Sequence, residues 1–481
     1  MKTEKSCGIP ELSAKQKVMI LIALALVFFF NNGDTALLSS AAPTILADLG
    51  QAELYALIFS AKLLTNAVFI LLSGKLSDRF GRRNIMLIGL VFIFIGYLGG
   101  GFSKSMAMLI AMRAVTGVGS GLSFGLGYTI LGDLFTGKSY GAGYMVQMAS
   151  SAVALIGGPI LGGVLATYLP WSFCFWTLVP MTVLAIIFLM AFCPNYKIDA
   201  KDSKLDRAGI VLFALAMSIL LFALSVVGGF FQWTSPLVLG SLLIAAVLLI
   251  IFFVHESKTE RNIAIFPVSL FKNRAISISC VGQLCMTLNS LCLLTYILYY
   301  VQNGMGKSAA VSGNVLSTIY IVSTLVGLFI TRRMGKGNRY GFWARFTVLG
   351  ESAALLLVVA LLKPEMSVQA LIVLMIVYGI FASVESTAFI MTAQSSLSPL
   401  RMAVGTSCLT FIQATASLLG TALGGTIINN SGDFIKGMTN VFLFAAIITI
   451  VGAVIVCVGM PNKDYIARQR ELAVKEDEKT A

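Results

Sequence analysis

Long apolar runs separated by short polar segments dominate the pattern of the chain. Fourteen of these runs approach the roughly 20 residues that a helix needs to cross the hydrocarbon core of a bilayer. They cover residues 17–38, 54–73, 84–103, 106–130, 141–168, 171–192, 208–229, 234–254, 275–300, 307–331, 342–362, 367–390, 402–428 and 437–460. Of the 481 residues, 58% are hydrophobic and only 11% are charged, so a soluble fold of this length could not bury the apolar surface. We therefore expect an all-α integral membrane protein with fourteen transmembrane helices.

The net charge of +13 is distributed unevenly over the segments between the runs. If the N-terminus lies in the cytoplasm, 28 of the 34 Lys and Arg residues fall on the cytoplasmic side and four on the opposite side. The remaining two, Lys62 and Arg113, lie well inside runs, away from either end. An excess of this size is the positive-inside pattern of multi-pass membrane proteins. It predicts a cell (plasma) membrane protein with both termini in the cytoplasm, and it explains the basic charge without a nucleic-acid partner.

The segment between the second and third runs combines charge with glycine. Residues 74–83 read GKLSDRFGRR, with four basic residues, one acidic residue and two glycines. Glycines and fixed charges in a tight turn between membrane helices predict a conformational latch and an orientation signal together. We expect Asp78 and Arg82 to form the latch pair. The supporting residues are Gly74, Arg79, Gly81 and Arg83.

A second basic segment with glycines, residues 331–339, follows the tenth run. If the seventh and eighth runs are set aside, two blocks of six remain, and each block carries such a loop after its second helix. Internal repeats of this kind place a central site near the membrane midplane in many transporters. The expected organisation is a cytoplasmic N-terminus (1–16), a six-helix bundle (17–192), connectors with two inserted helices (193–274), a second six-helix bundle (275–460) and a cytoplasmic tail (461–481).

These features are similar to those of the major facilitator superfamily. The segment 74–83 resembles the signature loop after the second helix of that family. The polar segments that end near residues 209 and 274 resemble the connectors of its fourteen-helix drug:proton antiporter branch. The resemblance covers nearly the whole chain and implies the major facilitator fold, with two six-helix bundles that rock about a central cavity. It also implies that the loop holds the outward-facing state.

Asp34 and Lys62 are ionisable residues inside the first and second runs. A carboxylate at the centre of a spanning helix costs about 2.5–3.5 kcal/mol on insertion scales, so it usually faces a cavity and has a function. In a helical hairpin centred near Gly50, the two residues differ in depth by about 6 Å, which a lysine side chain can span. We expect an Asp34–Lys62 ion pair that keeps the carboxylate ionised and offers a positive group to an anionic or zwitterionic substrate. The alternatives are an aspartate satisfied by neighbouring Asn and Thr residues, and a lysine that extends toward the outer interface.

Arg113 lies in the fourth run and is followed by glycines at 117, 119 and 121. The glycines permit close approach of a neighbouring helix. Because arginine does not lose its proton, we expect Arg113 to keep a nearby acid ionised, and Asp34 is the nearest acid by topology. The arrangement resembles the fourth-helix motif of the family. The first-helix segment around Asp34 also resembles a motif of the fourteen-helix exporters, except that Thr35 follows the acid directly.

The fifth run contains a proline between pairs of glycines. We expect a kinked and closely packed helix at this point, because proline and glycine both disturb regular helical packing. The string resembles the antiporter motif, which is found in exporters and is generally absent from symporters, so it indicates efflux. Its residues are Gly157, Gly158, Pro159, Gly162 and Gly163.

Two acids, Glu351 and Glu385, lie inside the eleventh and twelfth runs, each as an isolated carboxyl among apolar residues. Burial favours the neutral, protonated form of a carboxyl group, so either could exchange protons or bind a cationic substrate. We favour Glu385 slightly, because Glu351 is only about nine residues from a cytoplasmic helix end. The thirteenth run has Gln413 where relatives often carry an acid.

Together these residues predict proton-coupled efflux of drugs or other small amphipathic compounds by alternating access. The proton would be the coupling ion, and we expect no other cofactor and no metal site. The expected partners are a small-molecule substrate and the lipid bilayer, with the chain acting as a monomer. The alternatives are a selective exporter or exchanger of an anionic or zwitterionic metabolite, and a transporter-fold sensor that does not transport. An enzyme is not expected, because no nucleophile–base set, metal cluster or P-loop is present.

Overall fold

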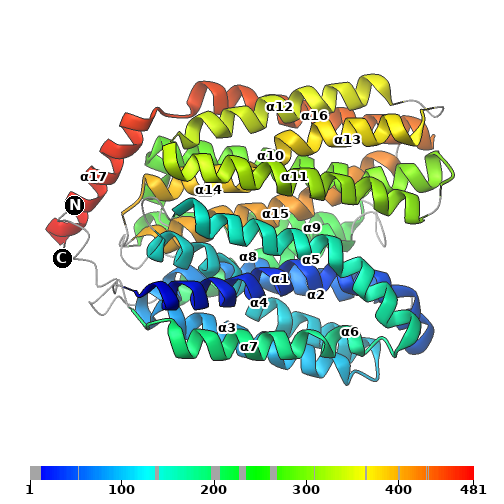
Figure 1. The fold of residues 1–481 in the computed structure, drawn as a ribbon, viewed down its shortest axis with the longest axis horizontal. Helices are drawn as coiled ribbons and strands as arrows, with labels where there is room; N and C mark the ends of the chain where they lie inside the picture. The colour runs from blue at the N-terminus through cyan, green and yellow to red at the C-terminus, as the bar shows by residue number, and fades with distance from the viewer. Residues whose placement is uncertain are drawn as a thin grey trace.

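The computed structural model describes residues 12–51, 54–135, 140–196, 206–226, 234–259, 268–307, 309–337, 339–362, 366–398, 401–429, 431 and 433–480. In these segments the regular secondary structure is helical throughout. Figure 1 shows long helices that run side by side in two groups, one formed by the first part of the chain and one by the last part. The expected all-α, multi-span architecture is therefore confirmed.

The first group precedes residue 193. It consists of α1 (Ala14–Leu49), α2 (Tyr55–Phe80), α3 (Arg82–Gly101), α4 (Met106–Leu134), α5 (Tyr140–Tyr168), α6 (Phe173–Trp176) and α7 (Leu178–Phe192). The second group consists of η4 (Val268–Lys272), α10 (Arg274–Tyr299), η5 (Tyr300–Gly304), α11 (Ala309–Gly337), α12 (Tyr340–Leu361), α13 (Val368–Ala382), α14 (Glu385–Ser395), α15 (Met402–Asn429) and α16 (Phe434–Gly459). The tail forms α17 (Lys463–Thr480), which extends from the end of the molecule where α1 begins (Figure 1).

Two further helices, α8 (Arg207–Val226) and α9 (Pro236–Lys258), lie between the groups in sequence. They pack against each other, and α8 also contacts α2 of the first group and α15 of the second. Phe213 of α8 meets Phe411 of α15 edge to face, with ring centroids 5.2 Å apart. The inserted pair therefore lies along the seam between the two groups.

The described residues contain thirteen helices that are long and apolar enough to cross a membrane. The expected seventh span, 208–229, corresponds to α8, whose described apolar stretch is Ala208–Leu220. This stretch is shorter than the usual spanning length. The count of fourteen therefore stays a prediction.

Several expected spans have different limits. α2 continues past residue 73 to Phe80 and α11 past residue 331 to Gly337, so most of both expected glycine loops is helical, and the sixth run forms α6 and α7. α1 continues past residue 38 because Ala41 and Ile45 are still buried against the bundle, and it ends at Gly50, whose φ of +66° suits glycine. The twelfth run, 367–390, forms two helices rather than one, because the backbone leaves the helical conformation before Glu385. This break makes Glu385 the first residue of α14.

The two groups touch at the end of the molecule where α2 turns into α3. The hydroxyl oxygens of Ser73 and Ser407 lie 3.3 Å apart. Tyr144 donates a hydrogen bond of 2.6 Å to Gln394 Oε1, and Gln394 Nε2 donates to the carbonyl of Tyr128 at 3.3 Å. The seam between the two groups is therefore closed at this end.

Candidate functional site

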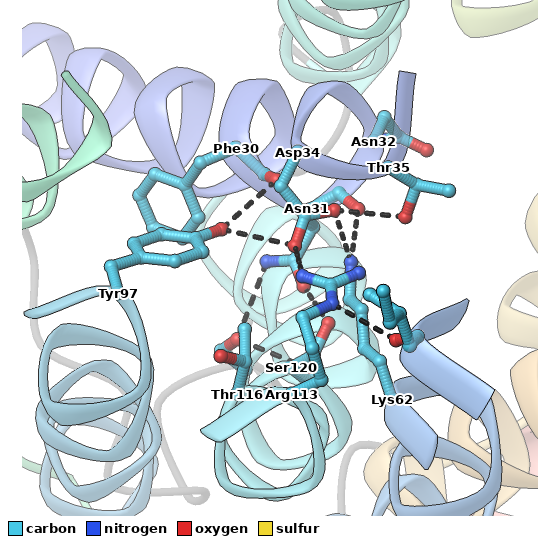
Figure 2. A network of polar contacts seen from close by, with 12 residues as sticks. Phe30, Asn31, Asn32, Asp34, Thr35, Lys62, Tyr97, Arg113, Thr116 and Ser120 are labelled. Atoms are coloured by element: carbon cyan, nitrogen blue, oxygen red, sulfur yellow. Dashed lines mark hydrogen bonds and ion pairs between the residues drawn. The ribbon is translucent and has the colours of Figure 1, made fainter. Parts of the chain in front are cut away.

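The first group holds a buried cluster of three charges. Lys62 of α2 donates to Asp34 Oδ1 of α1, and Arg113 Nη1 of α4 donates to Asp34 Oδ2 at 2.9 Å (Figure 2). Lys62 also donates to the carbonyl of Asn31 at 3.2 Å, and Arg113 Nε donates to the carbonyl of Ile58 at 3.2 Å. The ion pair expected from the hairpin geometry is present, and Arg113 joins it. We call Asp34, Lys62 and Arg113 the charge triad.

The charge triad is closed off from the surface. Asp34 and Arg113 have no exposed area, and Lys62 is only 4% exposed, so Lys62 does not extend toward an interface. One carboxylate faces two cations, so the cluster carries a net charge of +1. In the described part of the chain, Arg113 Nη2 is a buried donor with no hydrogen-bond partner.

Two further hydroxyl groups complete the shell around Asp34. Tyr97 of α3 points its hydroxyl at Asp34 Oδ2, 3.4 Å away, and Thr35 donates to Oδ1 at 3.0 Å (Figure 2). Sequence reasoning missed Tyr97, because one tyrosine in an apolar run carries no sign of which neighbour it faces. The sequence shows only that a buried tyrosine hydroxyl needs a hydrogen-bond partner, and not which residue provides it.

Glycines make the close packing at the charge triad possible. A Cβ atom on Gly117 of α4 would lie 2.9 Å from the Cα atom of Lys62, and one on Gly121 would lie 2.6 Å from the carbonyl oxygen of Asn66. Only glycine allows helix backbones to approach this closely. Gly117 and Gly121 therefore allow α4 to pack closely against α2 and keep the arginine within reach of Asp34.

The second group holds two acids in a polar network, so the expectation of isolated carboxyls among apolar residues was wrong. Asn289 of α10 donates to Glu351 Oε2 of α12 at 3.2 Å and contacts the hydroxyl of Tyr378 of α13 at 3.4 Å. Ser290 lies 3.0 Å from the same hydroxyl and donates to Glu385 Oε2 at 2.7 Å. We call these five residues the carboxyl network. Two of its five side chains, Asn289 and Ser290, come from α10, whose polar residues sequence reasoning did not single out.

The carboxyl network contrasts with the charge triad in having no cation. Within the described segments, neither Glu351 nor Glu385 has a Lys, Arg or His nitrogen within 4 Å. Glu351 has no exposed area, whereas Glu385 is half-buried. Hydroxyl and amide groups therefore provide all the polar contacts recorded for the two acids.

Gln413 lies next to this network rather than apart from it. Its amide donates to Ser386 Oγ at 3.1 Å, and the amide of Gln283 donates to the same oxygen at 2.9 Å. Ser386 follows Glu385 at the start of α14. Gln413 therefore places a neutral amide on the residue that follows Glu385.

The segment 74–83 contains the expected pair, but the expected turn over the whole segment was wrong: residues 74–80 continue α2, and only Gly81 separates α2 from α3. Arg82 Nη1 lies 2.6 Å from Asp78 Oδ1, and Arg82 Nε lies 3.1 Å from Asp133 Oδ2 at the end of α4. Tyr196 donates to the same Asp133 oxygen at 3.1 Å. Burial and the nearby Asp133 carboxylate raise the pKa of Tyr196 well above its usual value, so its hydroxyl remains a donor. Asp133 and Tyr196 were missed, because both are distant from this segment in sequence.

The two glycines of this segment have separate structural roles. Gly81 joins α2 to α3 with φ at +97°, a conformation that L side chains rarely adopt. A Cβ atom on Gly74 would lie 3.0 Å from the carbonyl oxygen of Ala403, so Gly74 allows α2 to pack against α15 of the second group. Arg83 donates to the carbonyl of Cys193 at 3.4 Å, and Arg79 lies over the ring of the adjacent Phe80.

The glycine–proline string lies within α5, which continues through Pro159. Gly158 and Gly162 face α1, where Cβ atoms would meet Gly33 and Leu37. Cβ atoms on Gly157 and Gly163 would meet nothing within 4 Å. The expected close packing therefore involves two of the four glycines, the two that are one turn apart on the face toward α1.

Comparisons with known proteins agree with this geometry. Residues 24–211 match the family model described as Major Facilitator Superfamily. The fold matches the human organic anion transporter MFSD10 (TETRAN) with a TM-score of 0.65 and 18% identity, over 92% of this chain and 100% of that one. It also matches a double-tryptophan mutant of XylE with a TM-score of 0.67 and 15% identity, over 96% of this chain and 99% of that one.

The chain therefore shares the fold of these two solved structures, and its residues 24–211 resemble the Major Facilitator Superfamily. This is a family of transporters and not of enzymes. Among similar sequences, Multidrug transporter protein MdtP of Bacillus subtilis (strain 168) is 28% identical over 66% of this chain and 59% of its own length. Multidrug resistance protein 3 of the same organism is 25% identical over 85% of this chain and 79% of its own length.

A mycobacterial superfamily member gives a higher identity over a longer part of the chain. An uncharacterized MFS-type transporter of Mycobacterium tuberculosis (strain ATCC 25618 / H37Rv) is 30% identical over 89% of this chain. The chain spans about three fifths of the length of this protein and of MdtP, at 61% and 59%. The similarity therefore covers most of this chain but only part of these two relatives.

Proposed function

We propose that this chain is a transporter of the major facilitator superfamily that exports small amphipathic compounds, including drugs, across the cell membrane in exchange for protons. It would belong to the fourteen-helix drug:proton antiporter branch, with both termini in the cytoplasm. The membrane potential contributes about 2.3 kcal/mol per charge per 100 mV, which supports export if net positive charge enters the cell. The relatives that are named as multidrug transporters support the same class of substrate.

One observation supports proton coupling most strongly. Glu385 is a half-buried carboxyl at the break between α13 and α14, and its recorded partners are the neutral hydroxyl groups of Thr287 and Ser290. A carboxyl with neutral partners can gain and lose a proton without leaving an uncompensated cation. Its partial exposure gives it access to water or substrate. Glu385 is therefore the primary proton-coupling residue in this proposal, and Glu351 assists it.

The charge triad has a different part in the proposal. Asp34 has two cationic partners, so protonating it would leave Lys62 and Arg113 uncompensated in a buried site. Asp34 is therefore a poor proton carrier by itself. We assign the charge triad to organising α1, α2 and α4 next to the substrate path.

The closed seam between the two helix groups and the ion pairs that Arg82 makes with Asp78 and Asp133 support an outward-facing state. Ion pairs of Arg82 with Asp78 and Asp133 connect α2, α3 and α4. Gly74 allows α2 to pack closely against α15. We propose that this cytoplasmic network stabilises the closed seam and must rearrange when the cavity opens inward. The glycine face of α5 toward α1 supports the assignment to exporters, because it corresponds to the antiporter motif.

The proposal is tested with ethidium transport in reconstituted vesicles, with and without an imposed pH gradient. The parent protein should transport ethidium faster with the gradient, and Glu385→Gln should lose this acceleration. Glu471→Gln, in the exposed part of α17, is the matched control and should behave like the parent. Ethidium transport by the parent that ignores the gradient would overturn the antiport mechanism.

A second candidate function is supported by the charge triad. Its net positive charge and the unpartnered Arg113 Nη2 would suit an anionic or zwitterionic substrate. In this case Lys62→Met should change the substrate range more than Glu385→Gln does. An unchanged transport profile in Lys62→Met, across anionic, zwitterionic and cationic compounds, would exclude this candidate.

A further inference from the structure

The carboxyl network connects its two acids through hydroxyl groups. Glu385 Oε2 accepts from Ser290 at 2.7 Å, and Ser290 Oγ lies 3.0 Å from the hydroxyl of Tyr378. The Tyr378 hydroxyl and Glu351 Oε2 lie on either side of the same amide nitrogen, because Asn289 Nδ2 donates to the hydroxyl at 3.4 Å and to the carboxyl oxygen at 3.2 Å. The series therefore runs from the Glu385 carboxyl on α14 to the Ser290 hydroxyl on α10. It continues to the Tyr378 hydroxyl on α13 and ends at the Glu351 carboxyl on α12.

The two ends of this series differ in their access to water. Glu385 is half-buried, whereas Glu351 has no exposed area. A proton can therefore reach Glu385 from its exposed side, but it needs an internal path to reach Glu351. The hydroxyl groups of Ser290 and Tyr378 provide such a path, because each can accept a proton and donate one.

A second observation indicates that a proton belongs at the inner end. In the described part of the chain, Glu351 Oε1 is buried and has no hydrogen-bond partner, and the same is true of Asn289 Oδ1. The Asn289 amide nitrogen already donates to Glu351 Oε2, so its side chain is directed at this acid. A buried acceptor without a donor is unfavourable, and protonation of Glu351 would supply the missing donor.

The surroundings leave this arrangement without competing charges. Within the described residues, the titratable side chains that interact with each of the two acids are the other acid and Tyr378. α10 contributes only neutral groups to them, namely Thr287, Asn289 and Ser290. Arg345, on the same helix as Glu351, donates instead to the carbonyl of Met460.

We propose that Ser290 and Tyr378 relay protons between Glu385, the outer acid, and Glu351, the inner acid. A proton on Glu385 passes to Ser290 Oγ, Ser290 gives its own proton to Tyr378, and Tyr378 gives its own to Glu351. At each hydroxyl oxygen one O–H bond forms and one breaks, so the net result is the transfer of one proton between the carboxyl groups. The proposal rests on the proton coupling proposed above and deepens it, because the two acids then store protons as one unit.

The test uses time-resolved infrared spectroscopy of the purified, reconstituted protein after a rapid drop in pH. Protonated carboxyl bands are assigned with Glu351→Gln and Glu385→Gln. In the parent, the Glu351 band should appear after the pH drop. In Tyr378→Phe and in Ser290→Ala it should appear more slowly by roughly a hundredfold or more, the lower end of the usual effect of a positioned proton-transfer group.

Matched controls separate the relay from general effects of substitution. Tyr320→Phe on α11 removes another tyrosine hydroxyl of the same helix group, and Ser352→Ala on α12 removes a hydroxyl that donates to the carbonyl of Val348. Both should keep the parent rate. If Tyr378→Phe does not fold, Ser290→Ala decides the question.

Two outcomes would overturn the relay. One is a Glu351 band that appears at the parent rate in both Tyr378→Phe and Ser290→Ala. The other is a parent in which Glu351 does not become protonated at all. Because the measurement needs no substrate, it is separate from the ethidium test, and a protein that relays protons but does not export ethidium would be recognised as such.

Discussion

The two helix groups handle buried charge in opposite ways. In the first, the Asp34 carboxylate has Lys62 on one oxygen and Arg113 on the other. In the second, Glu351 and Glu385 have only hydroxyl and amide partners among the contacts recorded for them. The first arrangement fixes the charge state, because any change leaves an unpaired buried ion. The second allows the charge state to change, which is what a proton-coupled cycle requires.

This difference predicts that neutralising an acid lowers the stability of the protein strongly in the first group and changes it little in the second. The largest effect is expected for Asp34→Asn, which leaves two buried cations side by side. Removing one partner of a buried ion pair typically destabilises a protein by about 3–5 kcal/mol. The measurement is thermal unfolding of the purified protein in detergent. A melting temperature equal to that of the parent would show that Asp34 does not compensate the cations.

A double substitution tests whether charge balance is the reason. Asp34→Asn combined with Lys62→Met returns the cluster to a net charge of +1, as in the parent. We expect it to recover a substantial part, about 1–3 kcal/mol, of the stability lost in Asp34→Asn. The same unfolding measurement compares the double variant with both single variants. Additive losses would contradict a charge-based explanation.

Tyr97→Phe should have a smaller effect at the same site. It removes one hydroxyl that lies 3.4 Å from Asp34 Oδ2 and keeps the ring that packs against Phe30. Because the contact is long, we expect a loss of about 1 kcal/mol. A Tyr168→Phe control, at a tyrosine that is 80% exposed, should show no change in thermal unfolding. A Tyr97→Phe loss as large as that of Asp34→Asn would show that the tyrosine has a greater role than its geometry suggests.

The smallest effect on stability is expected for the acids of the second group. Glu351→Gln and Glu385→Gln keep the shape of the side chain and remove a group that has no cationic partner. We expect a change of less than about 1 kcal/mol, or a small gain, because burial of a charge is avoided. Thermal unfolding and pH-gradient-driven transport are measured on the same samples. Strong destabilisation by either substitution would mean that the carboxyl network is structural, as the charge triad is.

The sequence predicted the charge triad better than the carboxyl network, and the reason is physical. Helix length and rise place Asp34 and Lys62 at similar depths in a hairpin, so their meeting followed from spacing alone. The acids of the second group depend on Asn289, Ser290 and Tyr378. These residues lie on different helices whose relative rotation is set by tertiary packing, which spacing within one helix does not determine.

The helices themselves followed from the apolar pattern, but their interruptions did not. Pro159 lies inside α5 without ending it, whereas the break before Glu385 occurs where the sequence has neither proline nor glycine. In the segment 74–83, Asp78 and Arg82 are four residues apart, so the sequence could predict their ion pair. Asp133 could not be assigned to Arg82, because their contact depends on how α3 packs against α4.

Proton release on substrate binding tests the central claim, that the acids of the second group carry the protons, most directly. Ethidium is added to the purified protein in weakly buffered detergent solution, and the protons released are measured with a pH-sensitive dye. The parent and Glu471→Gln should release protons, and Glu385→Gln should release markedly fewer. Full proton release from Glu385→Gln together with Glu351→Gln in one protein would contradict the claim, because the protons would then come from elsewhere.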